Sequence, residues 1–296
     1  MRRQLVVLLA LVTVVLLGGP ASAADPGWPK ELTFALLSTE SAPEVVRRWG
    51  PILEQLEKDL GVKVKSVSAT DYRGTIEALR FKKAELGHLG PKAYIEASTN
   101  NYANVEPIVQ VQQANGSLGY RSCLIVHADS DVFSPVDMGG KTFAFNDPNS
   151  TSGYLVPSAF FMMEMGIDPK SHFSKLTFSG SHEASIIAVA NKKVDVASTN
   201  LPDLQQLVRE GKVPRTALRV IWVSKLIPND PVVVRKDLPE SLRSAIQESL
   251  ATMKARAPQA FAQGGAFVGG FAQADDGKYQ IIRDLNETSK RLAAKK

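Results

Sequence analysis

Short apolar runs alternate with longer stretches of helical spacing along most of the chain. The run Leu32–Leu37 predicts a strand, and Val45–Leu60 predicts a helix because its apolar side chains recur at the intervals of a helix face. The same alternation then predicts strands at 62–67, 86–89 and 105–111, with helices at 72–82 and 91–98. Strands that alternate with helices in this way form an α/β unit, in which helices cover both faces of a sheet.

A second α/β unit is predicted from about residue 126 onward. Its strands are expected at 141–145, 175–178, 194–197 and 218–223, and its helices at 154–166, 183–191 and 201–210. A further strand is expected at 232–235. From Pro239 onward we expect helices, including Leu242–Arg256, that return to the first unit.

The two units are expected to form two lobes joined by two extended crossings, near Tyr120–His127 and Ile227–Val234. We expect residues 30–122 with 232–290 in the first lobe and residues 123–231 in the second, each lobe being a mixed sheet flanked by helices. A cleft between two such lobes is suited to the capture of a ligand by hinge closure.

The N-terminus has the features of a secretory signal peptide over residues 1–23. Arg2 and Arg3 are basic, Leu5–Leu17 is apolar, and Ala21–Ala23 provides small residues for cleavage. The apolar run is too short for a membrane-spanning helix, which needs roughly 20 apolar residues. No cysteine follows the cleavage site to carry a lipid. We therefore expect a soluble, exported protein.

Charge and cysteine content narrow the classes of protein further. Without Arg2 and Arg3 the formal charge falls from +5 to +3, and the remaining Lys and Arg residues are spread along the chain, so we expect no nucleic-acid partner. Cys123 is the only cysteine and cannot form an internal disulfide. Its position in the apolar run Cys123–Val126 favours a small buried side chain over a reactive or metalloid-binding thiol.

One segment, Asp147–Tyr154, carries the most specific chemistry. It joins a predicted strand to a predicted helix and contains three consecutive hydroxyl residues and a glycine: Ser150, Thr151, Ser152 and Gly153. The first backbone N–H groups of a helix have no partner within the helix, and the helix dipole favours negative charge there. With three O–H donors added, this turn is suited to a tetrahedral oxyanion, although Ser or Thr at such a position also serves as an ordinary N-cap.

His182 lies in a similar position, in a loop that follows a predicted strand and opens a helix. An imidazole there can donate to an oxyanion or can simply cap the helix. His88, His127 and His172 lack such a setting and are expected to be structural, and no His or Cys pattern predicts a metal site. The chain has neither a nucleophile-elbow motif nor a Walker-type phosphate loop, so we expect no catalytic residues, no cofactor and no enzyme activity.

Several linked segments resemble the phosphonate-binding periplasmic proteins of ABC importers. They span nearly the whole chain after the signal peptide: Asp71–Tyr72, Leu79–Phe81, Gly119–Ser122, Asp147–Pro157, Gly180–Glu183, Ala188–Ala197 and Val220–Pro231. The resemblance implies a type II periplasmic-binding-protein fold, a periplasmic location and a small oxyanion ligand such as a phosphonate, phosphite or phosphate. It also implies an ABC permease in the inner membrane as the partner, and we expect the protein to be a monomer.

The resemblance assigns roles to the hydroxyl residues and to the histidine. The family's hydroxyl cluster falls on Ser150, Thr151 and Ser152, which would hold the phosphonate oxygens together with nearby backbone amides. The family's histidine falls on His182, which would be a further donor to those oxygens.

The resemblance also implies two cleft tyrosines, at Tyr72 and Tyr120, and an aspartate at Asp230 that helps to hold the ammonium group of a ligand. One position departs from the family pattern. The glutamate that faces the ammonium in the member that prefers an aminoalkylphosphonate is replaced by Pro202, and Asp203, one residue further on, either substitutes for it or caps the next helix. The missing carboxylate weakens the expectation of aminoethylphosphonate and leaves room for methylphosphonate, phosphite or phosphate.

Two alternatives remain open at this point. A protein of the same fold could present an oxyanion, including arsenite held by Cys123, to a membrane sensor kinase, although strand alternation directs Cys123 away from Tyr120. An exported phosphoester hydrolase that uses Ser150 and His182 is the other alternative, and no sequence motif supports it.

Overall fold

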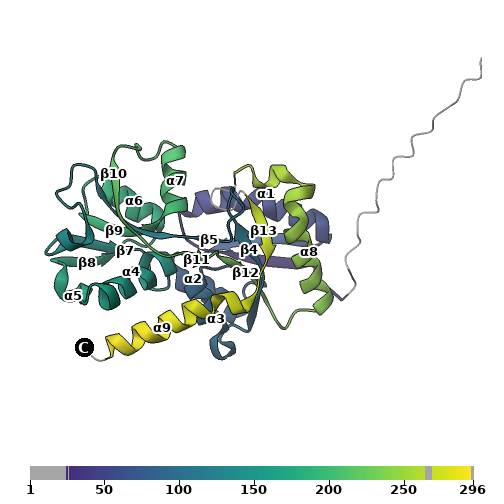
Figure 1. The fold of residues 1–296 in the computed structure, drawn as a ribbon. Helices are drawn as coiled ribbons and strands as arrows, with labels where there is room; N and C mark the ends of the chain where they lie inside the picture. Colours follow the sequence, from purple (N-terminus) through teal and green to yellow (C-terminus); the bar gives the residue numbers. More distant parts are fainter. Residues whose placement is uncertain (1–24, 26, 264–268, 295–296) are drawn as a thin grey trace, which may run out of the picture.

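The structure is a computed structural model that describes residues 25, 27–263 and 269–294 (Figure 1). The signal peptide predicted at residues 1–23 lies outside the described residues. No helix in the described ranges is long and apolar enough to cross a membrane. The chain folds into two α/β lobes, each built on its own mixed sheet, as the hydrophobic pattern predicts.

The first lobe is built on a six-stranded sheet in the order β13-β4-β12-β3-β1-β2. Its strands are β1 (Glu31–Leu36), β2 (Lys63–Ser68), β3 (Leu86–His88), β4 (Val105–Gln112), β12 (Pro231–Arg235) and β13 (Gly270–Gln273). β1 pairs in parallel with β2 and β3, whereas β12 pairs antiparallel with β3 and β4, so the sheet is mixed. The edge strand β13 is not predicted by the sequence pattern, which indicates only helices after Pro239.

Helices cover both faces of this sheet. They are α1 (Ala42–Leu60), α2 (Tyr72–Arg80), α3 (Pro91–Ser98) and α8 (Glu240–Arg256). α1 and α8 enclose one buried apolar cluster that includes Trp49 and Leu250, and α2 and α3 enclose another, on the opposite face, that includes Ile76 and Tyr94. The apolar stripes of these helices therefore fix which face each helix turns to the sheet.

The second lobe is built on a five-stranded sheet in the order β10-β6-β9-β7-β8. Its strands are β6 (Ser122–His127), β7 (Thr142–Phe145), β8 (Lys175–Phe178), β9 (Val196–Asn200) and β10 (Leu218–Val223). Its helical segments are η3 (Thr151–Leu155), α4 (Val156–Ala159), η4 (Phe160–Glu164), α5 (Pro169–His172), α6 (His182–Ala190) and α7 (Leu201–Arg209). α6 and α7 cover the face on which Cys123 is fully buried, as its apolar run predicts, and the segment from η3 to α5 covers the other face.

The chain crosses between the lobes at two short strands, β5 (Gly119–Tyr120) and β11 (Ile227–Pro228), which pair antiparallel. A Cβ at residue 119 would lie 2.8 Å from the carbonyl oxygen of Ile227, so glycine allows the crossings to pair this closely. Both crossings are shorter than predicted, since Pro231–Arg235 forms β12 inside the first sheet and does not extend the second crossing to Val234. Residues 122–127 form β6, which is paired on both sides inside the second sheet, so the prediction that the first crossing extends to His127 is wrong.

The last helix, α9 (Gln280–Ala293), packs against both lobes (Figure 1). It contacts α3 of the first lobe and α4 and η3 of the second. α8 returns to the first lobe as predicted, but α9 extends the C-terminus across the junction. A groove of about 390 Å³ runs between α9 and the second lobe, and the side chains of Met163, Leu226 and Ile281 are exposed along it.

The connecting segments also contain short 3₁₀ turns. These are η1 (Thr99–Asn101), η2 (Pro135–Met138), η5 (Pro258–Phe261) and η7 (Asp276–Tyr279). The first three follow a helix or join two elements within a lobe, and η7 leads directly into α9.

Candidate functional site

A cavity of about 60 Å³ lies between the two lobes. Since roughly 10–15 Å³ of such volume accommodates one water molecule, it has room for a ligand with only a few non-hydrogen atoms. All seven residues that the sequence singles out line this cavity: Tyr72, Tyr120, Ser150, Thr151, Ser152, His182 and Asp230. The fold thus brings together residues that are as far apart in the chain as 72 and 230, with both lobes contributing.

The hydroxyl residues lie at the start of a helix, which begins three residues earlier than predicted. Ser150 is the N-cap, and its Oγ accepts a hydrogen bond from Gly153 N at 3.0 Å. Residues 151–155 form a π-helical turn, in which Leu155 N donates to Ser150 O at 3.1 Å. The prediction of a helix from Tyr154 is therefore wrong at its N-terminus, because the capping hydroxyl starts the helix at Thr151.

The π-helical turn has an identifiable chemical cause. In an ordinary α-helix the N–H of residue 157 would donate to Gly153 O. Residue 157 is a proline and has no N–H, so Gly153 O is free to accept from other groups. Instead, Gly153 O accepts from Asn146 N at 3.0 Å and from Ser198 Oγ at 2.7 Å. A Cβ at residue 153 would lie only 2.3 Å from Asn146 Cβ, so glycine is required for this approach. These bonds fix the hydroxyl turn to the ends of β7 and β9.

The three hydroxyl side chains are buried and meet groups from other elements. Thr151 Oγ1 accepts from Lys92 N, at the start of α3 in the first lobe, at 2.8 Å. Ser152 Oγ lies 3.4 Å from His182 Nε2. The Tyr120 hydroxyl lies beside Ser152, and burial, together with the charge of Asp230, raises the pKa of this tyrosine well above its usual value, so the phenol is neutral. We call Ser150–Ser152 with His182 the hydroxyl end of the cavity.

Several helices direct their first turns at the cavity. Four helices each contribute lining residues from the first turn: Tyr72 in α2, Thr151 and Ser152 in η3, His182 in α6, and Pro202 and Asp203 in α7. The partial positive charge of a helix N-terminus favours an anion, so these convergent N-termini add to the hydrogen-bond donors of the hydroxyl end.

His182 is neutral at physiological pH. Burial lowers its pKa from 6.5 to about 4, and the charge of Asp230 only partly opposes this effect. Its Nδ1 lies 3.1 Å from Thr199 Oγ1, and no carboxylate is hydrogen-bonded to the ring among the described residues. A serine hydrolase requires a base that an acid orients, so the arrangement of Ser150 and His182 does not favour the phosphoester hydrolase alternative.

Carboxylates also line the cavity. Asp203 is one of them, and its Oδ2 accepts from Asn200 Nδ2 at 2.7 Å. The N-cap of α7 is Asn200, whose Oδ1 accepts from Asp203 N at 2.8 Å, so Asp203 faces the cavity and holds the capping residue. Burial raises the pKa of Asp203 to about 6. Asp230 Oδ2 lies 3.4 Å from His88 Nε2. His88 also lines the cavity, a position that the sequence does not predict for it.

The sequence analysis does not identify two further charged residues that line the cavity, Glu40 and Arg48. Both side chains are buried, and the Arg48 guanidinium donates to Glu40 with Nε–Oε1 and Nη2–Oε2 distances of 2.8 Å. Gln206 Nε2 of the second lobe donates to Glu40 Oε1 at 3.0 Å. We call Glu40, Asp203 and Asp230 the acidic end of the cavity. The sequence does contain one indication that Arg48 is buried, because this arginine lies within the apolar stripe of α1, beside Val45.

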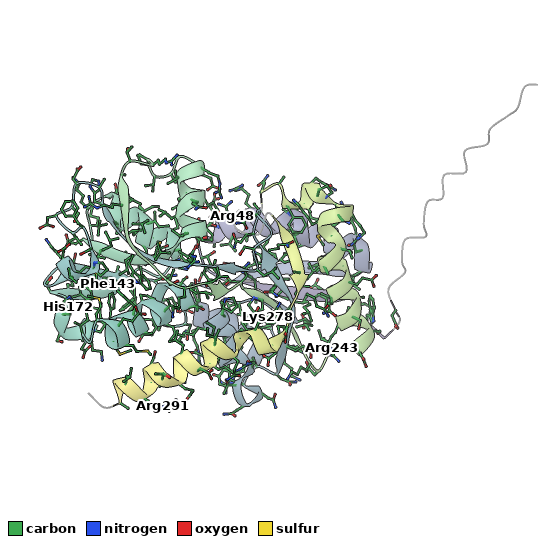
Figure 2. All side chains as sticks on the ribbon, in the orientation of Figure 1. Arg48, Phe143, His172, Arg243, Lys278 and Arg291 are labelled. Atoms are coloured by element: carbon green, nitrogen blue, oxygen red, sulfur yellow. The ribbon has the colours of Figure 1, made fainter. Side chains whose placement is uncertain are left out.

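Ion pairs around Arg48 also join the lobes, and Figure 2 places Arg48 between α1 and α7. Arg48 Nη2 lies 2.8 Å from Glu210 Oε1, at the end of α7. Ser41 N donates to Glu183 Oε2 of α6 at 2.9 Å. Lys212 Nζ lies 3.8 Å from Glu44 Oε2 of α1. These contacts, which we call the interlobe ion cluster, hold the lobes together in the closed arrangement.

Cys123 lies away from this chemistry. It is fully buried in the core of the second lobe, and burial raises the pKa of its thiol. It is not among the residues that line the cavity between the lobes. A thiol in this setting is poorly suited to metalloid capture, which needs an accessible thiolate.

Comparisons with known proteins agree with this geometry. Residues 34–279 match the family model described as "ABC transporter, phosphonate, periplasmic substrate-binding protein". Over 233 residues, which are 77% of this chain and 67% of the relative, the chain is 40% identical to the phosphonates-binding periplasmic protein of Escherichia coli (strain K12). Over 218 residues, 70% of this chain and 67% of the relative, it is 30% identical to a phosphate-import protein of Mycolicibacterium smegmatis.

A solved structure resembles the whole fold. It is the crystal structure of a binding protein component of an ABC phosphonate transporter from Pseudomonas aeruginosa, with a TM-score of 0.81 and 34% sequence identity. The alignment covers 89% of this chain and 87% of that chain. The similarity therefore extends over both lobes.

Proposed function

Since the chain belongs to the family of periplasmic substrate-binding proteins of phosphonate ABC transporters, we propose that it captures a phosphonate-like oxyanion between its lobes and delivers it to a permease in the inner membrane. The observation that carries the proposal is the hydroxyl end of the cavity. There, consecutive hydroxyls at a helix start meet a neutral histidine and further helix N-termini inside a closed cavity. Such a set of neutral donors suits a tetrahedral oxyanion.

The residues of the hydroxyl end and the two cavity tyrosines have distinct roles in this proposal. Thr151 and Ser152 donate O–H groups to the oxyanion, and Ser150 holds the turn in shape through its bond to Gly153 N. His182 donates from one ring nitrogen. Tyr72 and Tyr120 donate from neutral phenols, because burial raises the pKa of both well above the usual value.

The acidic end of the cavity accepts the other end of the ligand. Asp230 Oδ1 is buried and has no hydrogen-bond partner among the described residues. An unsatisfied buried acceptor is costly, so a donor on the ligand is favoured there. Asp203 supplies the carboxylate that the proline at position 202 removes, so an aminoalkylphosphonate remains a suitable ligand beside methylphosphonate.

The remaining parts of the proposal concern export and organisation. The predicted signal peptide directs the chain to the periplasm, where it acts as a monomer, since both ends of the cavity come from one chain. The lobes are 30–122 with 232–290 and 123–231, and rotation about the paired strands β5 and β11 opens and closes the cavity.

Calorimetric titration of the purified exported protein tests the proposal. The panel is methylphosphonate, 2-aminoethylphosphonate, phosphite, phosphate and sulfate, with the protein first freed of co-purified ligand by partial unfolding and dialysis. We expect at least one phosphorus oxyanion to bind with a micromolar or lower dissociation constant. The absence of binding to every phosphorus oxyanion at millimolar concentration would overturn the proposal.

A further inference from the structure

A second, larger cavity of about 760 Å³ adjoins the ligand cavity on the side of α7 and the lobe crossings. The two cavities share five lining residues: Arg48, Gln113, Tyr120, Pro202 and Gln206. These five residues therefore border both spaces. We call the larger space the basic vestibule, because its charged lining residues are Arg47, Arg48, Arg121, Arg209 and Glu210.

The positive charge of the basic vestibule is only partly balanced. Arg48 is paired with Glu40 and with Glu210, the single acidic residue of the lining. Arg121 Nη1 donates to the Ser224 carbonyl at 2.6 Å. Within the described part of the chain, neither Arg121 nor Arg209 forms an ion pair, so two guanidinium groups remain available to an anion.

The two cavities differ in the charges of their linings. The ligand cavity offers the donors of the hydroxyl end and the carboxylates of Asp203 and Asp230, whereas the basic vestibule offers the guanidinium groups of Arg121 and Arg209. Pro202 stands on the boundary, and its ring adds no charge at the passage. Gln113 and Gln206 stand beside it and carry amide N–H donors.

We propose that the protein binds phosphonates that carry an α-amino acid group, with the phosphonate at the hydroxyl end, the ammonium at the acidic end and the carboxylate among the amides and arginines of the basic vestibule. This inference rests on the proposed function of the same cavity. The ammonium and the carboxylate of such a ligand branch from one carbon, so the ammonium can face Asp203 while the carboxylate faces the basic vestibule across the shared lining. Charge-assisted hydrogen bonds to the carboxylate would favour this ligand over an amine without a carboxylate.

The test compares two ligands that differ by one carboxylate, 2-aminoethylphosphonate and 2-amino-3-phosphonopropionate, with methylphosphonate as reference. Calorimetry of the purified full protein at pH 7.5 should give about tenfold tighter binding of the carboxylated ligand than of the amine alone. Equal binding of the two, or weaker binding of the carboxylated ligand, overturns the inference.

The variant Arg209→Gln tests whether the basic vestibule causes the tighter binding of the carboxylated ligand. We expect this variant to lose most of the advantage of the carboxylated ligand, whereas its affinity for methylphosphonate stays within twofold of the wild type. The matched control is Arg291→Gln, at the exposed end of α9, which should change neither affinity (Figure 2). A retained advantage in Arg209→Gln, or an equal loss for all three ligands, contradicts the proposed placement of the carboxylate.

Arg121→Gln provides a second variant on the other wall of the basic vestibule, and it should reduce the same advantage. Melting temperatures of all variants exclude misfolding as the cause of a loss. The reference ligand separates the two proposals: binding of methylphosphonate without any advantage of the carboxylate overturns only this inference. Absence of binding to every phosphonate overturns the proposed function as well.

Discussion

The two ends of the ligand cavity use different chemistry to meet a charged ligand. The hydroxyl end gathers neutral donors, Ser150–Ser152 and a His182 whose pKa burial lowers to about 4. The acidic end gathers carboxylates, and one of them, Asp203, has a pKa that burial raises to about 6. Burial therefore favours the neutral form at both ends, but only the acidic end contains a group whose charge changes close to neutral pH.

The difference shows how a closed cavity can hold an anion without burying a formal positive charge against it. Neutral donors and helix N-termini cost less to bury than an ammonium or a guanidinium. Arg48, the guanidinium on the wall, is paired with Glu40 and Glu210. The hydroxyl end thus remains ready for an anion in the empty protein, whereas the acidic end depends on the protonation state of its carboxylates.

The largest effect is expected at the hydroxyl end. Thr151→Ala removes a donor to the oxyanion and the acceptor of the bond from Lys92 N in the other lobe. Calorimetry should show phosphonate binding weakened about 10- to 100-fold, while the melting temperature of the ligand-free protein changes little. Thr252→Ala, an exposed threonine on α8 whose Oγ1 bonds to Glu248 O, is the matched control and should change neither quantity. A large loss of stability in ligand-free Thr151→Ala would favour a purely capping role.

The effect of a substitution at the acidic end should depend on whether the ligand carries an ammonium group. Asp203→Asn keeps an oxygen for the bond from Asn200 but removes the charge that faces an ammonium. Titration should show about tenfold weaker binding of 2-aminoethylphosphonate, with methylphosphonate binding unchanged or tighter. An equal loss for both ligands would indicate that Asp203 acts by holding Asn200, the N-cap of α7, and not through its charge.

A substitution in the interlobe ion cluster should change the binding of every ligand to a similar extent. Glu210→Gln weakens the pair with Arg48 that joins the lobes in the closed arrangement. Stopped-flow measurements should show ligand release accelerated about three- to tenfold for every ligand, with little change in the association rate. Glu287→Gln, an exposed position on α9, is the control. A loss confined to one ligand would place Glu210 in recognition instead of closure.

The smallest effect is a difference in the pH dependence of stability. The folded protein resists protonation of His182 until about pH 4, whereas the unfolded chain binds that proton near 6.5, so stability is lost as the pH falls between these values. The opposite holds for Asp203, whose pKa is raised from 3.8 to about 6: the unfolded chain ionises first, so stability is lost as the pH rises through this range.

Melting temperatures of the ligand-free protein at pH 4.5 and 7.5 can separate the two contributions. Relative to the wild type, His182→Gln should gain stability at pH 4.5 compared with pH 7.5, and Asp203→Asn should gain at pH 7.5 compared with pH 4.5. Each difference is expected to amount to several degrees, because one pKa unit corresponds to about 1.4 kcal/mol. Slopes of the same sign in the two variants would contradict the opposite titration of the two ends.

The two ends also differ in how far the sequence predicts them. The hydroxyl end is local: Ser150, Thr151 and Ser152 are consecutive, and the strand and helix around them are readable from their apolar pattern. The predicted start of the helix is wrong because the π-helical turn depends on Pro157 and on the distant donor Ser198, whose Oγ bonds to Gly153 O. No local pattern contains that information.

The acidic end is assembled from distant segments, so its composition appears only in the structure. Glu40 comes from the loop before α1, Gln206 from α7 and His88 from the end of β3. The sequence does not distinguish Asp203 from a capping acid, whereas in the structure Asn200 caps α7 and Asp203 lines the cavity. The edge strand β13 was missed for a related reason: its pairing with β4 is a long-range contact of four residues.

The position of α9 across both lobes has a practical consequence. Its groove shares no lining residue with the ligand cavity, and Met163 of the second lobe and Ile281 of α9 are both exposed along it. Cys123, the single cysteine of the sequence, is buried with its pKa raised, so it should stay inert toward maleimide dyes. One cysteine introduced at Met163 would thus give a uniformly labelled protein. A fluorescent dye attached to that cysteine should change its fluorescence intensity when the lobes close. The labelled protein could then serve as a fluorescent sensor for phosphonates in water.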